Sequence, residues 1–162
     1  SMTERLNGIR DVFSDEISLS NTENEPAASR GATIALFKKA NDFTMLFALS
    51  ESLAIGALSG LRELDVRIPE DLSFAAFDDF PLASHWSPSL TVIRQDTAGL
   101  ARAAVNLLLK RIQAPDDLFA SIRINASIEW RGSVITNGTV GPLQGPPPVR
   151  PEAELGISPA TT

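Results

Sequence analysis

A chain of 162 residues with 43% hydrophobic residues is long enough to bury one ordinary core, and its length favours a single domain. Its formal net charge of −6 opposes nucleic-acid binding by this segment, because phosphate contacts need clustered Lys and Arg. The absence of cysteine excludes a disulfide framework, and the single histidine disfavours a zinc site. We therefore expect neither a metal nor a cofactor.

The hydropathy pattern predicts no membrane-spanning segment. The apolar runs at residues 45–49 and 72–77 are far shorter than the roughly 20 residues that a transmembrane helix requires. The N-terminus also lacks the basic and then apolar pattern of a secretory signal peptide. We therefore expect no membrane partner and a cytoplasmic location.

The first part of the chain predicts a helix, a short strand and a second helix. Apolar residues at helical spacing follow Thr3, a suitable N-cap, and predict an amphipathic helix over residues 3–14. Residues 17–19 are expected to form a short strand before a polar loop. Pro26 is expected to begin a helix that reaches residue 40, because the N–H that proline lacks has no partner in a first helical turn.

The middle of the chain predicts strands that alternate with helices. Residues 45–49 and 72–77 are apolar throughout, as in buried strands. Between them Ser50 is expected to cap a helix that ends before Asp65. The apolar stripe of this helix consists of Ala54, Ala57, Leu58 and Leu61. Continuously apolar strands are typical of a parallel sheet with helices on both faces, so the predicted fold class is α/β.

The next segment predicts a loop, a strand and a long helix. Residues 81–88 are rich in Pro and Ser and are expected to form the loop, and residues 91–95 the strand. Residues 97–113 follow the i, i+3, i+4, i+7 pattern closely and predict a helix that Pro115 ends. The apolar positions in this pattern are Leu100, Ala103, Ala104, Leu107, Leu108 and Ile112.

The last part of the chain predicts little regular structure. Residues 122–126 and 127–130 are expected to form two short strands. Residues 135–162 contain Gly-Pro and Pro-Pro-Pro steps with few large apolar groups, so we expect a flexible tail. A partner-binding motif in the Pro-rich stretch 142–151 is the alternative to a plain terminus.

Few residues are candidates for chemistry. His85 lies in a Ser- and Pro-containing loop and is expected to be exposed rather than to serve as a catalytic base. Asp78 and Asp79 follow an apolar strand, where α/β sheets usually place ligand groups. For this pair, a structural role in which one Asp accepts loop N–H groups is favoured over ligand contact. Glu51 begins a helix directly after a strand, and either hydrogen bonding to sugar hydroxyls or a favourable interaction with the helix dipole explains it.

The chain contains, in this order, the segments RLNGI (5–9), FALSESLAIGAL (47–58), LREL (61–64), VRIPEDLS (66–73), FDD (77–79), PSLTVIRQD (88–96) and WRGS (130–133). In order and spacing these segments resemble the effector domain of the lactose/galactose-repressor (LacI/GalR) family of bacterial transcriptional regulators. The resemblance covers about residues 3–134.

This resemblance implies a type I periplasmic-binding-protein-like fold, in which two α/β lobes clamp a small molecule in the cleft between them. Residues 1–134 would form the C-terminal part of this effector-binding domain. Because the chain of the family crosses between lobes, we expect residues 96–115 to pack on an N-terminal lobe that is missing here.

The resemblance also assigns effector contacts position by position. Arg5 corresponds to the family's arginine that hydrogen-bonds effector hydroxyls, and Gln95 to a glutamine at the crossover into the other lobe. Glu51 falls where most members have the aspartate of an Asn-Asp pair, and it is one methylene longer. Glu25 falls near a position that is commonly Asn or Asp. Asp78 is a further candidate from its place after a strand.

These residues fit a sugar-like or other polyhydroxylated effector, because arginine donates and carboxylates accept. A cationic or amine-bearing effector is the rival. We therefore expect no enzyme, but the ligand-sensing part of a regulator that forms a homodimer and contacts operator DNA through a helix-turn-helix domain absent from this chain. The alternative is a solute-binding protein of a transporter with the same fold, which the repressor-like segments at 66–73, 77–79 and 88–91 disfavour.

The chain opens on Ser-Met directly before the first expected helix, as an expressed fragment with a tag remnant would. On that interpretation, an isolated lobe is expected to cover its helix at residues 97–113 by pairing with a second copy of the chain.

Overall fold

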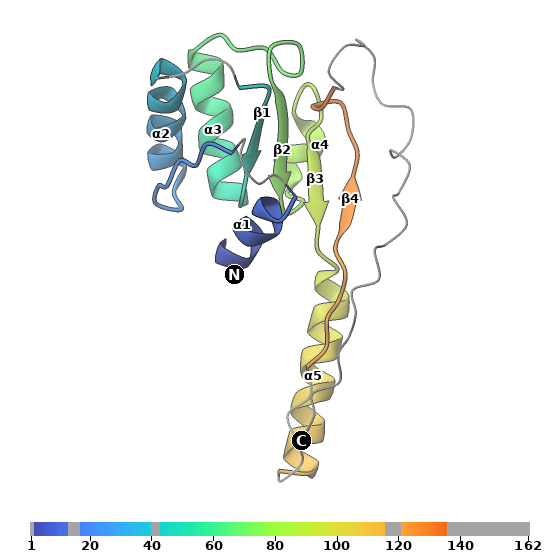
Figure 1. Cartoon of the computed structure of the whole chain (residues 1–162). Coiled ribbons are helices and arrows are strands. Elements are labelled where there is room, and N and C mark those ends of the chain that lie inside the picture. Colours follow the sequence, from blue (N-terminus) through green and yellow to red (C-terminus); the bar gives the residue numbers. More distant parts are fainter. Residues whose placement is uncertain (1, 13–16, 40–42, 116–120, 136–162) are drawn as a thin grey trace.

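A computed structural model describes residues 2–12, 17–39, 43–115 and 121–135 (Figure 1). The expected tail, apart from its first residue, lies outside the described residues. In chain order the elements are α1 (Met2–Arg10), α2 (Pro26–Lys39), β1 (Met45–Ala48), α3 (Glu51–Glu63), β2 (Ser73–Phe77), α4 (Pro81–His85), β3 (Thr91–Arg94), α5 (Thr97–Gln113) and β4 (Ser127–Glu129).

The strands form a four-stranded sheet in the order β1-β2-β3-β4. β1 pairs parallel with β2, and β2 pairs parallel with β3. β4 adds an antiparallel edge, with Val92 opposite Glu129. The predicted α/β class with a parallel sheet is thus confirmed. Since parallel strands point the same way, the carboxyl ends of β1, β2 and β3 meet at one edge of the sheet.

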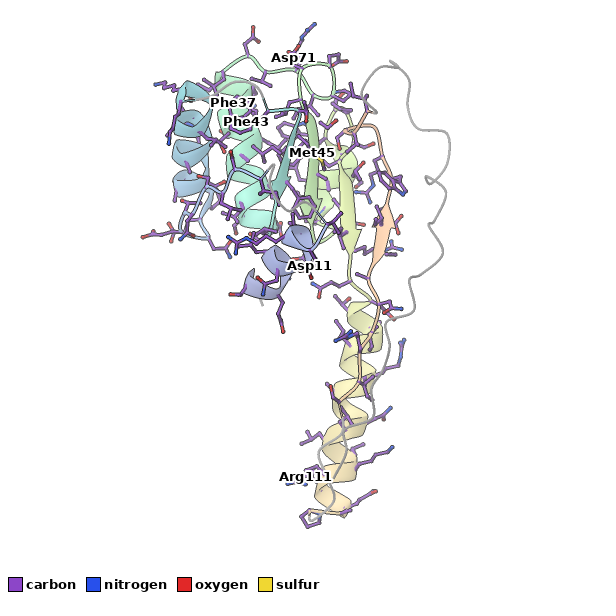
Figure 2. All side chains as sticks on the ribbon, viewed as in Figure 1. Asp11, Phe37, Phe43, Met45, Asp71 and Arg111 are labelled. Carbon is purple, nitrogen blue, oxygen red and sulfur yellow. The ribbon has the colours of Figure 1, made fainter. Side chains whose placement is uncertain are left out.

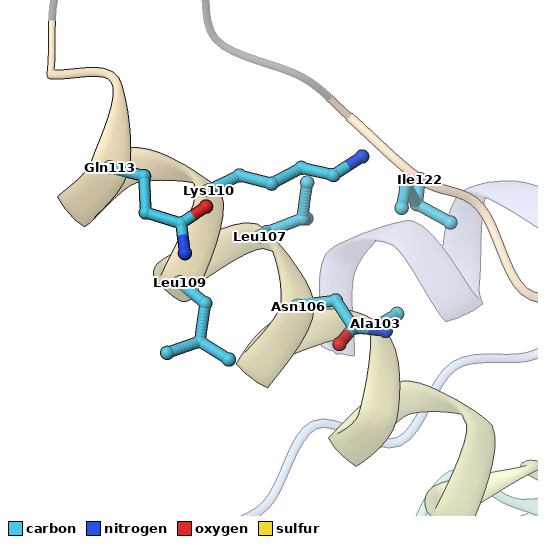
Figure 3. Close-up of a pocket in the computed structure, with 7 residues that line it drawn as sticks. All are labelled: Ala103, Asn106, Leu107, Leu109, Lys110, Gln113 and Ile122. Atoms are coloured by element: carbon cyan, nitrogen blue, oxygen red, sulfur yellow. The ribbon is translucent and has the colours of Figure 1, made fainter.

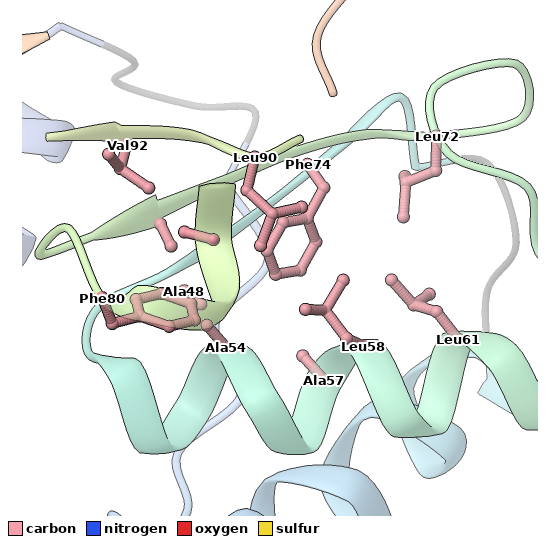
Figure 4. Packing of buried hydrophobic residues seen from close by; sticks show 12 residues of the cluster. Ala48, Ala54, Ala57, Leu58, Leu61, Leu72, Phe74, Phe80, Leu90 and Val92 are labelled. Carbon is pink, nitrogen blue, oxygen red and sulfur yellow. The ribbon is translucent and has the colours of Figure 1, made fainter. Parts of the chain in front are cut away.

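Helix α3 packs on the sheet through its predicted apolar stripe. Its N-cap is Ser50, as expected, whose hydroxyl accepts a hydrogen bond from the Leu53 N–H at 3.3 Å. Figure 4 shows the side chains of α3 against Phe74 and Leu72 of the sheet region, with Phe80 beside the first turn of the helix. The buried cluster consists of Ala48, Ala54, Ala57, Leu58, Leu61, Leu72, Phe74, Ala76, Phe80, Ala83, Leu90 and Val92.

Helix α2 lies against the outer side of α3, because glycine lets the two backbones approach. A Cβ at Gly56 would meet the carbonyl oxygen of Pro26 and would lie 2.6 Å from the Cβ of Ser29. The Ser29 hydroxyl donates to the carbonyl of Leu53 at 2.7 Å. Near the end of α2, the ring of Phe37 packs against the ring of Phe43 in the segment before β1, with their centroids 5.5 Å apart (Figure 2).

Two predicted strands are wrong. Residues 17–20 belong to no strand, and residues 122–126 likewise lie outside the sheet. A strand needs a neighbour for its backbone hydrogen bonds, and β3 ends at Arg94, where the chain turns into α5. Residues 122–126 extend past that point beside α5, so of the two expected C-terminal strands only β4 pairs with the sheet (Figure 1).

Two helix predictions also need correction. Helix α1 begins at Met2, so Thr3 lies inside the helix and is not its N-cap. The helix ends at Arg10 and a turn follows, while the last two residues of the range 3–14 lie outside the described residues. The expected loop at 81–88 contains the short helix α4, which sequence periodicity missed because only Ala83 within it is buried. His85 ends α4 and is exposed, as expected.

Helix α5 has the predicted bounds but does not pack on the sheet. It extends away from the sheet in Figure 1, and no residue in it is buried. Its large side chains Val105, Leu108 and Ile112 are 54%, 60% and 67% exposed. Among the helices of the described segments, none has the length and apolar content needed to cross a membrane.

Candidate functional site

Three of the residues predicted from the sequence meet at the carboxyl edge of the sheet. Arg5 comes from α1, Asp78 follows β2, and Gln95 follows β3. The Gln95 Nε2 donates to Asp78 Oδ1 at 2.5 Å, and the Arg5 Nη1 lies 3.4 Å from Asp78 Oδ2. Asp78 therefore links the other two residues into one polar cluster, which we call the edge cluster (Arg5, Asp78 and Gln95).

The backbone of the sheet holds Arg5 in place. Its Nη1 donates to the Leu49 carbonyl, just after β1, at 2.6 Å. Its guanidinium carbon lies 3.8 Å from the centre of the Phe77 ring. Planar guanidinium groups stack well on aromatic faces, so the ring fixes the plane of the donor fork. Both of these polar contacts use Nη1.

Asp78 owes its position to an uncommon backbone conformation. Its φ is 75°, in the left-handed region that Asp enters more readily than most residues. Its N–H donates to the Ile93 carbonyl at 2.9 Å, which continues the pairing of β2 with β3 for one residue. The chain therefore turns sharply at the strand end and directs this carboxylate toward Arg5 and Gln95.

The neighbouring Asp79 has a different and structural role. Its two carboxylate oxygens accept hydrogen bonds from the Arg131 Nη2 at 3.0 and 2.9 Å. Arg131 also donates to the Leu90 carbonyl at 3.1 Å. The structural role expected for one of the two aspartates is present, but its donor is a side chain 52 positions away, which no local pattern identifies.

The other two predicted residues lie outside these contacts. Glu51 is the exposed first residue of α3, two positions after Leu49. Glu25 is exposed. Its neighbour Asn24 accepts a hydrogen bond from the Ser50 hydroxyl at 2.5 Å and ties the loop before α2 to the start of α3. Sequence reasoning did not single out Asn24, because its contact with Ser50 joins residues 26 positions apart.

The cluster is partly exposed to solvent rather than enclosed. The side chains of Arg5 and Asp78 are 23% and 35% exposed. Two hollows are formed along α5 instead: one of about 520 Å³ faces Leu107 and Ile122 (Figure 3), and another of about 600 Å³ lies where β3 leads into α5. Gln95 borders the second hollow and contacts Asp78, so it connects the edge cluster to the α5 region.

Comparison with known proteins identifies the family. Residues 2–134 match the family described as periplasmic binding protein-like domain. A ribose operon repressor of Haemophilus influenzae is 35% identical over 91 residues, which are 56% of this chain and 27% of that repressor. A second H. influenzae protein, the HTH-type transcriptional repressor PurR, is 42% identical over 74 residues, which are 46% of this chain and 22% of that protein.

A solved structure supports the same assignment. A LacI family transcriptional regulator from Enterococcus faecalis with bound ribose superposes with a TM-score of 0.74 at 28% identity, covering 82% of this chain and 49% of that one. The chain thus spans about half of this solved regulator and about a quarter of the curated repressors. The LacI resemblance inferred from the sequence is confirmed, and the chain belongs to the periplasmic binding protein-like domain family, among relatives that are LacI-type transcriptional regulators.

Proposed function

We propose that this chain is the ligand-sensing part of a LacI-type regulator and that the edge cluster binds a polyhydroxylated effector. The observation that carries the proposal is the chain of contacts from Arg5 through Asp78 to Gln95. It presents the N–H donors of a fixed guanidinium group and a carboxylate acceptor at the sheet edge where α/β proteins bind ligands. Adjacent sugar hydroxyls both donate and accept, so one diol can satisfy both groups.

The aromatic face in the cluster fits the same class of ligand. The guanidinium of Arg5 already stacks on Phe77 and is therefore held before any ligand arrives. A donor that is ordered in advance loses less entropy on binding. Glu51 and Glu25 are proposed as further contacts from the same lobe, by position rather than by contact with the cluster. That two relatives are named or solved with ribose supports a sugar over other polyols.

The wider function follows from the family. We propose that the parent protein dimerises, binds operator DNA through a helix-turn-helix domain outside this chain, and acts in the cytoplasm without catalysing a reaction. The effector would change DNA affinity only by as much as its affinity differs between the two states of the regulator. In such a full-length protein, Arg5→Ala should abolish the effector response and leave operator binding intact.

The direct test is an NMR titration of the 162-residue chain with D-ribose, cellobiose and, as a cationic rival, 1,4-diaminobutane. A single lobe supplies only part of a cleft, so binding is expected at about millimolar concentrations. The expected result is that a sugar shifts the resonances of Arg5, Asp78 and Gln95. Arg5→Ala and Asp78→Asn should each abolish these shifts.

The control is Arg67→Ala, which removes an exposed arginine before β2, at the opposite edge of the sheet. It should leave the sugar-induced shifts unchanged. If only the diamine shifts the resonances of the edge cluster, the effector is a cation and not a sugar. Shifts elsewhere only, or no shift with any of the three compounds, would refute the cluster as the effector site.

A further inference from the structure

An asparagine in the loop before α2 is held in one orientation by a buried partner. The Ser50 hydroxyl donates to Asn24 Oδ1 at 2.5 Å and accepts from the Leu53 N–H at 3.3 Å. Ser50 is buried, whereas Asn24 is exposed. A hydroxyl has only one proton to donate, so this bond turns the carbonyl end of the Asn24 amide toward Ser50.

The orientation of this amide decides what it offers to a ligand. The two ends of a side-chain amide differ, because the oxygen only accepts hydrogen bonds and the NH2 group only donates them. Within the described residues the structure pairs only the Oδ1 of Asn24. The exposed end of Asn24 is therefore a pair of N–H donors that faces away from Ser50.

Asn24 lies beside the edge cluster, because both are tied to the same peptide bond. Arg5 Nη1 donates to the Leu49 carbonyl at 2.6 Å, and the next residue, Ser50, holds Asn24. The Leu49 oxygen and the Ser50 Oγ are at most about 5 Å apart, so the guanidinium of Arg5 and the amide of Asn24 lie within roughly 10 Å of each other. In Figure 1, α1 and the first turns of α2 and α3 accordingly lie at the same end of the sheet.

This separation suits a ligand with the dimensions of one sugar ring. A hydrogen bond at each end takes up about 3 Å, which leaves roughly 4–5 Å between the two ligand oxygens. Hydroxyl groups on one sugar ring provide such a separation. Asn24 can therefore reach an oxygen across the ring from the diol that Arg5 and Asp78 bind.

We propose that Asn24 is a specificity-determining residue of the effector site and donates through Nδ2 to a second oxygen of the bound sugar. Ser50 acts on the ligand through Asn24 and is a positioning residue. The inference rests on the proposed function of the edge cluster and adds a second point of contact to it. That contact favours a sugar over a simple diol, which has no further oxygen, and over an ammonium group, which cannot accept a hydrogen bond.

An NMR titration of the 162-residue chain tests the contact with the sugar, D-ribose or cellobiose, that shifts the edge cluster. Both residues belong to this chain, although it spans about half of the compared regulator, so the rest of a longer protein is not required. The side-chain NH2 resonances of Asn24 should move with the same dissociation constant as those of Arg5 and Gln95. Asn24→Ala should raise that constant about three- to tenfold.

Two controls separate this contact from general effects. Asn21→Ala removes an exposed asparagine three positions earlier in the same loop and should leave the affinity unchanged. The ring diol cis-1,2-cyclopentanediol should bind more weakly than the sugar and equally to the wild type and to Asn24→Ala. If Asn24→Ala weakens the diol as much as the sugar, Asn24 makes no second contact and the inference is refuted.

Substitutions at Ser50 separate its positioning role from its role as the cap of α3. Ser50→Thr keeps both the cap and the hydroxyl proton and should bind the sugar like the wild type. Ser50→Asp keeps a good cap but has no proton to donate at neutral pH, so it should weaken binding as much as Asn24→Ala does. In an Asn24→Ala background, Ser50→Asp should have no further effect on the affinity.

The outcomes distinguish this inference from the proposed function. If the sugar shifts the edge cluster but Asn24→Ala binds it like the wild type, the inference is overturned and the proposed function stands. If Ser50→Asp weakens binding equally with and without Asn24, its effect does not pass through Asn24, and the positioning role is refuted. If no sugar shifts the edge cluster, the proposed function fails and this inference fails with it.

Discussion

The sheet with α2 and α3 differs from α5 in how its apolar residues are used. In the first region apolar side chains from several elements share one buried cluster, and the two helices touch through Gly56. In α5, leucines and isoleucine follow an equally regular pattern, yet none is buried. The difference teaches that periodicity predicts a helix and its apolar sides, while burial depends on whether another layer is present to receive them.

Hydrogen exchange should show the largest difference between these two regions. Amides of β2 can exchange only through global unfolding, whereas α5 can open without disturbing the buried cluster. We expect α5 amides to exchange at least about a thousand-fold faster than those of β2. Equal protection in the two elements would mean that α5 is part of the same cooperative unit.

Matched leucine truncations should separate the two regions in equilibrium stability. Leu58 is 1% exposed on α3, and Leu109 is 50% exposed on α5. Leu58→Ala should lower the free energy of unfolding by about 2–5 kcal/mol, because it leaves a cavity in the core. Leu109→Ala should lower it by less than about 0.5 kcal/mol. Urea unfolding measures both, and similar losses would contradict the comparison.

Two glycine substitutions should change stability in opposite directions. Gly56→Ala forces a methyl group into the contact between α2 and α3 and should cost about 1–3 kcal/mol of unfolding free energy. Gly31→Ala lies on α2, where an added Cβ meets nothing within 4 Å, and should stabilise by about 0.5–1 kcal/mol through higher helix propensity. A stabilising Gly56→Ala in thermal unfolding would show that the helices can separate freely.

The smallest effect is expected at the exposed turn before β2. Hydrogen bonds from the Arg67 side chain, and then from its backbone N–H, lower the pKa of Asp71 to about 2. Because the folded pKa lies below the unfolded value, this contribution to stability is complete above about pH 4 and is lost as the pH falls through about 2. Carboxyl NMR should give this pKa, and Arg67→Ala should return it toward its usual range.

Much of the fold could be predicted because local patterns and tertiary structure agree. The helix 97–113 was predicted with its observed bounds, and Ser50 was correctly identified as a cap. The short strand at 17–19 failed because alternation of Ile and Leu with Ser says nothing about which strand would pair with it. Helix α4 was missed because five residues are too few to show a period.

The candidate site was predictable in its residue types and not in its contacts. Family spacing identified Arg5 and Gln95, and the strand end identified Asp78. Nothing local could show that a guanidinium 73 positions before Asp78 would reach its carboxylate, or that Arg131 would bind Asp79. Such pairs depend on how β1, β2 and β3 align, which is fixed by the packing of the whole sheet.

Two neighbouring segments lie between the sheet and α5. One follows β3 and the other precedes β4, and both line the same hollow. The Arg94–Glu129 ion pair, at 2.8 Å, joins them on the sheet side. A helix attached to a sheet by one segment can turn in any direction, whereas two adjacent segments restrict the directions in which it can turn. Gln95 lies in the first of these two segments and donates a hydrogen bond to Asp78. The carboxylate of the edge cluster is therefore held by the same short stretch of chain that sets the direction in which α5 leaves the sheet.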